Sequence, residues 1–500
     1  MTAARSEPGA VALDSPEGRV VIATTVAGSA VAMLTATVVN VALPALADDL
    51  GASSGQQQWV INAYLLPLAS LIMIGGSLGD RYGRVRLYRI GIVWFAISSL
   101  LCAVAPGIGF LIAGRLLQGI GGALLTPGSL AIIDATLRPE DRGRGVGQWS
   151  GLSGIAAAIG PLVGGLLVDW SWRWVFVINL PVAAVVLLTS RRVPESSDPS
   201  ATGTPLDRVG AGLVAVALGG LSYGLIQGPG DGWGTTTIGA LLIGLAAGAA
   251  LWRYEPGREH PMVPIDLFSN RWFAAANVIT LLVYGGMGVV FFLLSIQLQV
   301  TAGWSPLRAG AALLPVTVLM LMLSSRAGEV AQRIGPRWPL TIGPFTLAVG
   351  MVLFSRIGPD TSYVTDVLPA SAVFGLGLSM SVAPVTSTAI GAVPDGRSGA
   401  ASGTNNATAR TGQMIAVAAI PAIVGLTGDA LSDPVQLDAG FADAMYLGAA
   451  FVALGGLAAL VLLRDRGPEA ERTDIDQPAL QCPVDGPLPG PAILEASRDR

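Results

Sequence analysis

Residues 75–86 read Gly-Gly-Ser-Leu-Gly-Asp-Arg-Tyr-Gly-Arg-Val-Arg, a charged stretch between two long apolar runs, 59–78 and 87–104. The acid Asp80 and three arginines lie within seven residues, and glycines on both sides allow a tight turn. Such a stretch cannot lie in hydrocarbon, where a charged residue costs about 2.5–3.5 kcal/mol or more. It therefore predicts a water-facing loop between two membrane-spanning helices.

The composition extends this prediction to the whole chain. Of 500 residues, 52% are hydrophobic and 12% are charged, half the share of about 25% that soluble proteins carry. The 65 glycines suit helices packed backbone to backbone in lipid. We expect an all-α polytopic membrane protein. All 29 cationic residues are arginines, so the lysine that a phosphate-binding loop requires is missing. The two cysteines and one histidine form no metal-ligand set. The expected protein is therefore not an enzyme, has no cofactor and does not bind nucleic acid.

Membrane-length apolar runs recur along the chain. A helix needs about 20 mostly apolar residues to cross a core of ~30 Å. Fourteen spans are predicted on that basis, at about 20–44, 57–79, 87–105, 109–135, 147–168, 174–190, 209–227, 236–254, 272–297, 306–325, 338–355, 364–388, 400–426 and 441–463. Arginines crowd the N-terminal segment and the loops after even-numbered spans, whereas the opposite loops hold Arg173, Arg308 and Arg356. This bias predicts a multi-pass cell-membrane protein with both termini in the cytoplasm.

Two loop patterns recur about 250 residues apart. Residues 328–337 repeat the pattern of 76–84, with Gln332 at the place of Asp80, and 394–399 repeats 139–145. Two six-span repeats with spans 7 and 8 inserted between them would give this register. The predicted organisation is a cytoplasmic N-terminal segment 1–19, a six-helix bundle 20–190, inserted helices with linkers 191–271, a second six-helix bundle 272–463 and a disordered cytoplasmic tail 464–500.

Four motifs carry a family resemblance. They are Gly76–Arg84 in the loop after span 2, Leu34–Pro44 in span 1, Gly160–Gly165 in span 5 and Trp172–Pro181 at the start of span 6. With them, residues 20–463 resemble the fourteen-helix drug:proton antiporter branch of the major facilitator superfamily. The resemblance implies a monomeric secondary transporter that exports small lipophilic or amphiphilic organic compounds (drugs, antibiotics or metabolites) by alternating access, with protons as the coupling ion.

Five charged residues are candidates for gating and coupling. The resemblance implies that Asp80, Arg81 and Arg84 latch the cytoplasmic side shut, and the alternative is a charge cluster that only fixes topology. Arg115 lies within a span, so it needs a paired or wetted site; the resemblance ties it to proton transfer, and the alternative is that it snorkels to the interface. Asp134, toward the cytoplasmic end of span 4, is the candidate proton acceptor.

Span 5 carries the signature that the resemblance links to antiporters. Gly151, Gly160, Gly164 and Gly165 leave much of the helix surface bare, and Pro161 removes one backbone hydrogen bond and bends the helix. Such a surface lets another helix approach closely across the two halves. Close packing alone explains the glycines equally well, so export rests on the resemblance.

The resemblance also implies a substrate cavity between the two bundles, and this chain departs from the branch in one residue of that cavity. Many members of the branch have an aspartate where this chain has Thr35, and no other acid lies clearly at mid-depth. Neutral, lipophilic or anionic substrates are therefore expected rather than multivalent cations, and proton coupling is left open. The candidate cavity residues are Thr35, Asn40, Gln118, Gln297, Gln299, Asn405, Asn406 and Arg410. For each amide, the alternative is a hydrogen bond between helices.

Several other functions remain open at this point. Within transport, they are a dedicated exporter of a metabolite or self-made antibiotic and a facilitator without proton coupling. Outside transport, they are a membrane receptor or scaffold on a transporter fold and a membrane-embedded enzyme. The sequence does not name the substrate or the stoichiometry.

Overall fold

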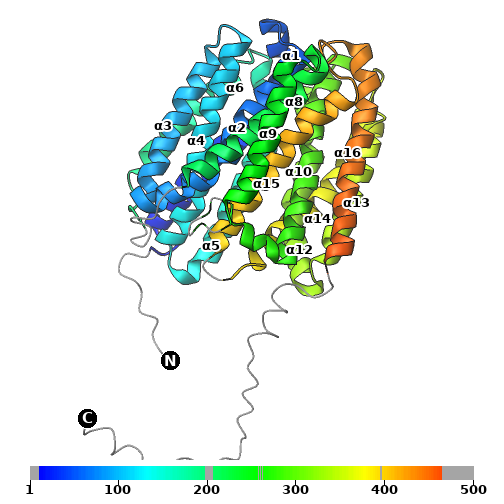
Figure 1. Cartoon of the computed structure of the whole chain (residues 1–500). Coiled ribbons are helices and arrows are strands. Elements are labelled where there is room, and N and C mark those ends of the chain that lie inside the picture. Colours follow the sequence, from blue (N-terminus) through cyan, green and yellow to red (C-terminus); the bar gives the residue numbers. More distant parts are fainter. Residues whose placement is uncertain are drawn as a thin grey trace, which may run out of the picture.

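The computed structural model describes residues 11–197, 207–256, 258, 261, 263–394 and 397–463. The predicted tail, 464–500, and residues 1–10 of the predicted N-terminal segment lie outside these residues. In the described part, long helices run side by side, and the chain begins and ends at the same end of the molecule (Figure 1). At that end, the Val11 amide donates to the Thr136 carbonyl at 2.9 Å, which ties the start of the described chain to the end of a helix.

The first part of the chain forms seven helical segments. They are α1 (Pro16–Leu50), α2 (Ser54–Tyr82), α3 (Arg84–Ala103), α4 (Ile108–Thr136), α5 (Pro139–Val168), α6 (Trp174–Val177) and α7 (Asn179–Ser190). Local sequence fixes their ends. The Ser15 hydroxyl accepts the Gly18 amide at 3.0 Å and caps α1, and Ser53 and Gln56 form a capping box on α2. Gly51, with a φ of 61°, ends α1 in the left-handed conformation that favours glycine.

The remaining segments follow in order. They are α8 (Arg208–Asp231), α9 (Thr235–Tyr254), the 3-10 turn η2 (Ile265–Ser269), α10 (Arg271–Ile296), the π-turn η3 (Gln297–Thr301), α11 (Pro306–Ala311), α12 (Leu314–Ile334), α13 (Arg337–Phe354), the π-turn η4 (Tyr363–Val367), α14 (Leu368–Gly391), α15 (Ser398–Ile423) and α16 (Pro434–Leu462). Most helices extend beyond the apolar runs that predicted them, because caps and glycines rather than the last apolar residue end a helix.

The helices pack in two groups. In the first, α4 lies against α2 and α3, and α1 lies against α5; in the second, α13 lies against α14 and α16, and α10 against α15 and α16. The groups meet where α2 packs on α15, α5 on α11 and α1 on α10. Helices α8 and α9 pair through Gly220 and Gly244, where an added Cβ on Gly220 would lie 2.5 Å from the Ala240 carbonyl oxygen. Helix α8 also contacts both α2 and α15.

Eleven described helical stretches are long and apolar enough to cross a membrane. Helices α5 and α15 and the α6–α7 segment are not among them. Helix α15 is too polar by composition, since it carries Asn405, Asn406, Arg410 and Gln413 in its middle. The count of fourteen spans and the insertion of α8 and α9 as a hairpin therefore stay predictions.

The charged stretch 75–86 is not the loop that the sequence predicted. Helix α2 continues through Asp80 to Tyr82, and α3 begins at Arg84, so Gly83 alone makes the turn. Gly83 has a φ of 104°, a conformation that side chains other than glycine rarely adopt. Gly335, between α12 and α13, makes the same kind of turn with a φ of 85°. The recurrence noticed in the sequence is therefore also a recurrence of backbone geometry.

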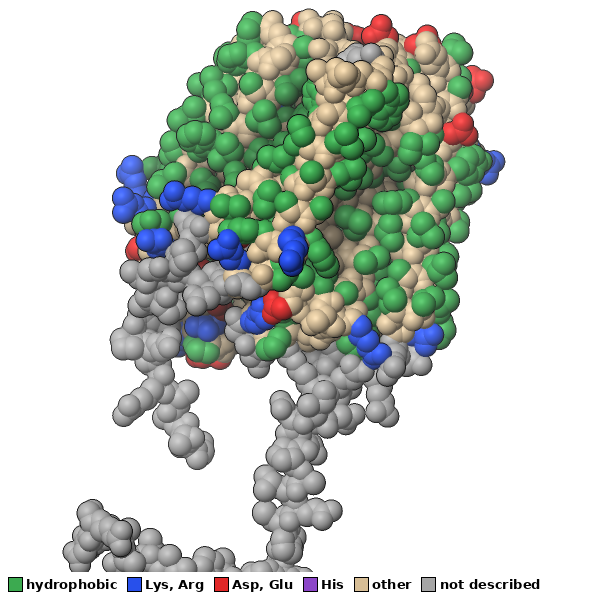
Figure 2. Space-filling model, in the orientation of Figure 1, with side chains coloured by type: hydrophobic (Ala, Val, Ile, Leu, Met, Phe, Trp, Pro, Cys, Tyr) green, Lys and Arg blue, Asp and Glu red, His purple; other side chains and the backbone are tan. Residues whose placement is uncertain are grey.

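Charge is sorted between the two ends of the molecule. On the face shown in Figure 2, most arginines lie toward the end where the described chain begins and ends, most acids lie toward the opposite end, and apolar side chains fill the belt between them. We call the end where the described chain begins and ends the mouth end; Asp80, Asp134 and Arg397 lie there. We call the opposite end the far end; Gly165, Gln299 and Gly310 lie there.

Candidate functional site

A large cavity lies between the two groups of helices. Its volume is about 980 Å³, and residues from α1, α2, α3, α4, α5, α8, α14 and α15 or their ends line it, together with Pro261 and Pro264 before η2. It extends from Asp80, Asp134 and Arg397 at the mouth end to Tyr64 and Arg410 in the middle of α2 and α15. A space of this volume is of the size that binds drug-sized molecules, about 300–1,000 Å³.

Ion pairs surround the mouth. The Nε of Arg84 donates to the Asp80 carboxylate at 2.8 Å, across the turn at Gly83. Asp134 faces Arg142 at 3.8 Å, and its side chain is 69% exposed, so this pair is weak. The candidate acceptor thus lies at the edge of the cavity rather than at mid-depth.

A third pair joins Asp266 in η2 to Arg397 before α15, and its Arg397 lines the cavity from the second group of helices. Arg397 donates to both carboxylate oxygens, in one case at 3.1 Å. This hydrogen bond from Arg397 holds the pKa of Asp266 below its ordinary value. The pair joins η2 to the residue before α15, the helix that carries Asn406 and Arg410; because both side chains are exposed, its contribution to stability is small.

The carboxylate of Glu195 caps α3. It accepts the backbone N–H groups of Val85 and Arg86, both at 2.9 Å, and so occupies the positive end of the α3 dipole. Glu195 was not among the residues predicted from the sequence. No local signal could have found it, because Glu195 lies 110 residues from Val85 in the chain.

Arg115 is buried behind the cavity wall. Its side chain is 1% exposed; Nε donates to the Val60 carbonyl at 2.9 Å and Nη1 donates to Gln118 at 2.6 Å. The guanidinium carbon stands 4.5 Å from the centre of the Tyr64 ring, which lines the cavity. Arg115 therefore lies behind Tyr64 and is not itself among the residues that line the cavity.

A chain of buried hydrogen bonds extends from Arg115 to Thr35. Gln118 donates to the Ser99 hydroxyl at 2.7 Å, and Asn179 donates to the same oxygen at 3.2 Å. The Thr35 hydroxyl donates to Asn179 at 3.0 Å. These hydrogen bonds join α4, α3, α7 and α1, and they pair polar groups that would destabilise the fold if they were left unpaired in the interior. Ser99 and Asn179 were not predicted, although Asn179 belongs to the motif noted at span 6.

The far end is closed by backbone packing between the two groups. A Cβ added to Gly165 of α5 would lie 2.5 Å from the Leu307 Cα, and one added to Gly310 of α11 would lie 2.1 Å from the Pro161 carbonyl oxygen. Gln299 donates to the Val41 carbonyl at 3.0 Å and so joins η3 to α1. At this end the helices can meet so closely because they lack side chains at the contact.

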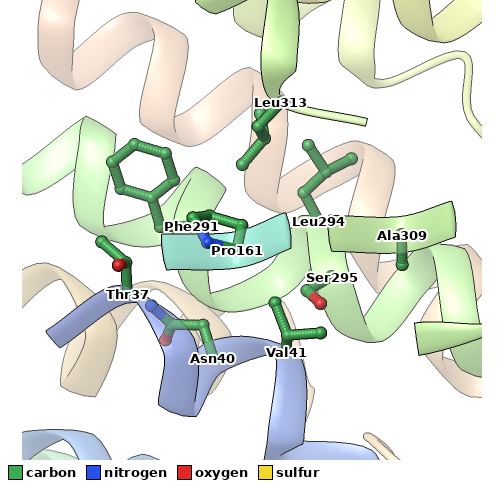
Figure 3. Close-up of a pocket in the computed structure, with 9 residues that line it drawn as sticks. All are labelled: Thr37, Asn40, Val41, Pro161, Phe291, Leu294, Ser295, Ala309 and Leu313. Atoms are coloured by element: carbon green, nitrogen blue, oxygen red, sulfur yellow. The ribbon is translucent and has the colours of Figure 1, made fainter. Parts of the chain in front are cut away.

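Figure 3 shows the void that remains there. Side chains of α1, α5, α10 and the α11–α12 region surround it; in this view Pro161 lies near the centre, with Thr37, Asn40 and Val41 of α1 below it and Leu313 above. Its volume is about 10 Å³. Since a single water needs roughly 10–15 Å³ of such space, this void is too small to hold a substrate.

The span 5 glycines divide between two partners. Gly160 and Gly164 face α1, where added Cβ atoms would lie 2.0 Å from the Thr37 hydroxyl and 3.1 Å from Val38. Gly165 faces α11 of the other group, as described above. The surroundings of Gly151 lie outside the described residues. The sequence predicted close approach across the two halves; here Gly165 meets the other group, whereas Gly160 and Gly164 meet α1 of their own group.

Two of the candidate cavity residues, Asn406 and Arg410, line the large cavity. Six others make hydrogen bonds to neighbouring groups and are not among its lining residues: Thr35, Asn40, Gln118, Gln297, Gln299 and Asn405. A role for these six as substrate contacts stays a prediction.

Comparison with known proteins places this geometry in context. The family model of the Major Facilitator Superfamily matches residues 25–417. The chain is 34% identical to the puromycin resistance protein pur8 of Streptomyces alboniger over 80% of its own length and 81% of that protein's. It is 33% identical to the methylenomycin A resistance protein of Bacillus subtilis (strain 168) over 89% of its length and 94% of that protein's.

Solved structures agree at the level of the fold. A bacterial homologue of the human lysosomal transporter Spinster, in an inward-facing and unoccupied conformation, superposes with a TM-score of 0.65 at 15% identity, over 93% of this chain and all of that one. A D-xylose–proton symporter superposes with a TM-score of 0.58 at 16% identity, over 89% of this chain and 97% of that one. At these identities the likeness concerns the fold alone.

Proposed function

Because this chain belongs to the major facilitator superfamily, we propose that it is a secondary transporter that exports small lipophilic or amphiphilic organic compounds in exchange for protons. The observation that carries the proposal is the cavity of about 980 Å³, which extends from the charged mouth end to mid-helix while the far end is packed shut. Relatives named for resistance to puromycin and to methylenomycin A support export as the direction.

In this proposal the two groups of helices move as bundles. Residues 20–190 form one and 272–463 the other, α8 and α9 are an inserted hairpin within 191–271, and the chain crosses the cell membrane fourteen times with both termini in the cytoplasm. The mouth end then faces the cytoplasm. Opening the far end requires α5 to separate from α11 and Gln299 to leave the Val41 carbonyl. A single chain holds the whole cavity, in accord with a monomer.

Proton coupling is proposed to act through the mouth. Asp134 lines the cavity, and its side chain is 69% exposed, so water reaches it; we propose it as the proton acceptor. Protonation would release Arg142 and remove one charge from the mouth. The Asp80–Arg84 pair joins α2 to α3 across Gly83 and would gate the mouth of the cavity. Arg115 and its hydrogen-bond partners would hold Tyr64 in place on the cavity wall.

Efflux from whole cells tests the proposal. Cells that produce the protein are loaded with neutral, anionic and cationic lipophilic dyes, and efflux is followed with and without a protonophore. We expect faster efflux of at least one dye class than in empty cells, abolished by the protonophore and slowed by Asp134→Asn. Asp360→Asn, in the turn after α13, is the matched control and should not differ from the wild type. Equal efflux in producing and empty cells would contradict export.

A further inference from the structure

Arg410 is a cationic group that faces the cavity at mid-depth. It lies near the middle of α15, about 18 Å along the helix from Ser398 at 1.5 Å per residue. Its side chain is half-buried and is among those that line the cavity. Arg115, which lies in α4, is 1% exposed and is not among the lining residues. Of these two arginines, Arg410 is the one that a molecule in the cavity can touch.

The charge of Arg410 is not neutralised within the described part of the chain. There its hydrogen-bond partner is the Gln413 side-chain oxygen, at 3.2 Å, and no carboxylate pairs with it. A guanidinium has five N–H donors in a planar fork that fits a carboxylate with two parallel bonds. A charged arginine at this depth is costly unless a wet or anionic site compensates it.

The acids among the described residues that line the cavity lie near its opening. The lining acids Asp80 and Asp134 lie in the last turns of α2 and α4, and Asp207 caps the start of α8. Deeper in, the walls are apolar or neutral and include Met33, Leu68 and Trp149. The inner part of the cavity therefore combines one positive charge with apolar and aromatic surface.

From this arrangement we infer that Arg410 is the binding site for the negative charge of an organic anion, such as the carboxylate of a molecule with an aromatic or lipophilic body. This inference rests on the proposed transport function and names the class of compound that its cavity accepts. The anion's oxygens pair with the guanidinium, and its body lies against the apolar wall. Asn406, one helical turn before Arg410 and also on the cavity wall, is the neutral neighbour that leaves the positive charge undiminished.

A matched pair of fluorescent probes tests the inference. Dansylglycine carries a carboxylate, and dansylglycinamide has the same body without the charge. Binding of each to the detergent-solubilised full chain is measured from dansyl emission. We expect the wild type to prefer dansylglycine. Arg410→Gln should weaken dansylglycine binding about tenfold or more and dansylglycinamide binding less than twofold, because a charge-assisted bond is lost. Arg410→Lys should keep most of the preference.

Two further variants remove ambiguity. Asn406→Asp places a carboxylate beside Arg410 and should lower affinity for dansylglycine alone, even if Arg410→Gln fails to fold. Arg356→Gln changes an exposed arginine after α13 that does not line the cavity, and it should bind both probes as the wild type does. Equal binding of the two probes by the wild type, or equal weakening of both by Arg410→Gln or Asn406→Asp, would overturn the inference.

The failure of this inference differs from a failure of the proposed function. A wild type that prefers dansylglycine through Arg410, but does not move it across proteoliposome membranes, would support the anion site and contradict transport. A wild type that moves both probes at rates that Arg410→Gln lowers equally would support transport and overturn the anion site.

Discussion

Replacing Gly165 by alanine is expected to open the far end. The added Cβ would lie 2.5 Å from the Leu307 Cα and 2.6 Å from the Pro306 carbonyl oxygen, whereas ordinary contacts begin at 3.4 Å. Since both atoms belong to the backbone, α5 and α11 must separate by about 1 Å to accept it. Overpacking of this kind costs about 1–3 kcal/mol. Because this contact exists only while the far end is closed, the cost falls on that conformation, and the ratio of closed to open forms should drop by about 5–150-fold.

Distance measurements between spin labels can detect this shift. Trp170, after α5, and Val435, at the start of α16, are 80% and 79% exposed at the far end, so cysteines at these positions can carry labels with little disturbance. In a background without Cys102 and Cys482, Gly165→Ala should enrich the longer distances. Gly147→Ala is the control on the same helix, since its Cβ would meet no atom within 4 Å. Identical distance distributions for wild type, Gly165→Ala and Gly147→Ala would refute the packing argument.

Three further predictions concern stability. Ser99→Ala removes the hydroxyl that accepts hydrogen bonds from the buried Gln118 and Asn179 amides, and it should lower the free energy of unfolding by about 1–3 kcal/mol. The hydroxyl of Ser98 bonds to carbonyl groups of its own helix, so Ser98→Ala should lower the free energy of unfolding less. Chemical denaturation of both variants measures the difference. Glu195→Gln should lower stability by about 1 kcal/mol through the loss of a charged cap on α3, measurable as a drop in Tm. Arg397 lowers the pKa of Asp266 in the folded protein, so this pair stabilises the fold at pH values above the unfolded-state pKa of about 3.9. The stabilisation is lost as the pH falls through the pKa of Asp266 in the folded state. Asp266→Asn should therefore reduce the difference between the Tm at pH 6 and the Tm at pH 3.

The sequence predicted the helical membrane fold because hydropathy and arginine placement act locally. It also predicted which helix would make close contacts, since only small residues permit them. It did not predict the partners: Gly164 lies against α1 while its neighbour Gly165 lies against α11. Which neighbour a bare surface meets depends on how the whole bundle is arranged, and spacing along one helix does not contain that information.

The site was predictable in kind but not in orientation. Arg115 and Arg410 were both singled out as arginines within predicted spans. In the structure, Arg115 is buried behind Tyr64, whereas Arg410 faces the cavity. Hydropathy reports how deep a residue lies and not the direction in which its side chain points. Asn179 and Glu195 were missed because their partners are far away in the chain and no local pattern marks such a contact.

The charged turn between α2 and α3 now has a more specific structure than the sequence suggested. One glycine, Gly83, makes the turn; Asp80 and Arg84 pair across it; and Glu195 secures the start of α3 from another part of the chain. Among the described residues, Asp80 forms no hydrogen bond or ion pair with the second group of helices in this conformation; its ion pair is with Arg84. Its role as a latch between the bundles stays a prediction.

The most direct test of proton-coupled export is transport by the purified protein in liposomes. Uptake of a lipophilic dye is measured with and without an imposed pH gradient, and Asp134→Asn is assayed beside the wild type. Our account predicts that the gradient accelerates transport by the wild type and that the variant loses most of this acceleration. Transport at the same rate with and without the gradient would contradict proton antiport, and the absence of any protein-dependent transport across a panel of neutral, anionic and cationic compounds would contradict the account as a whole.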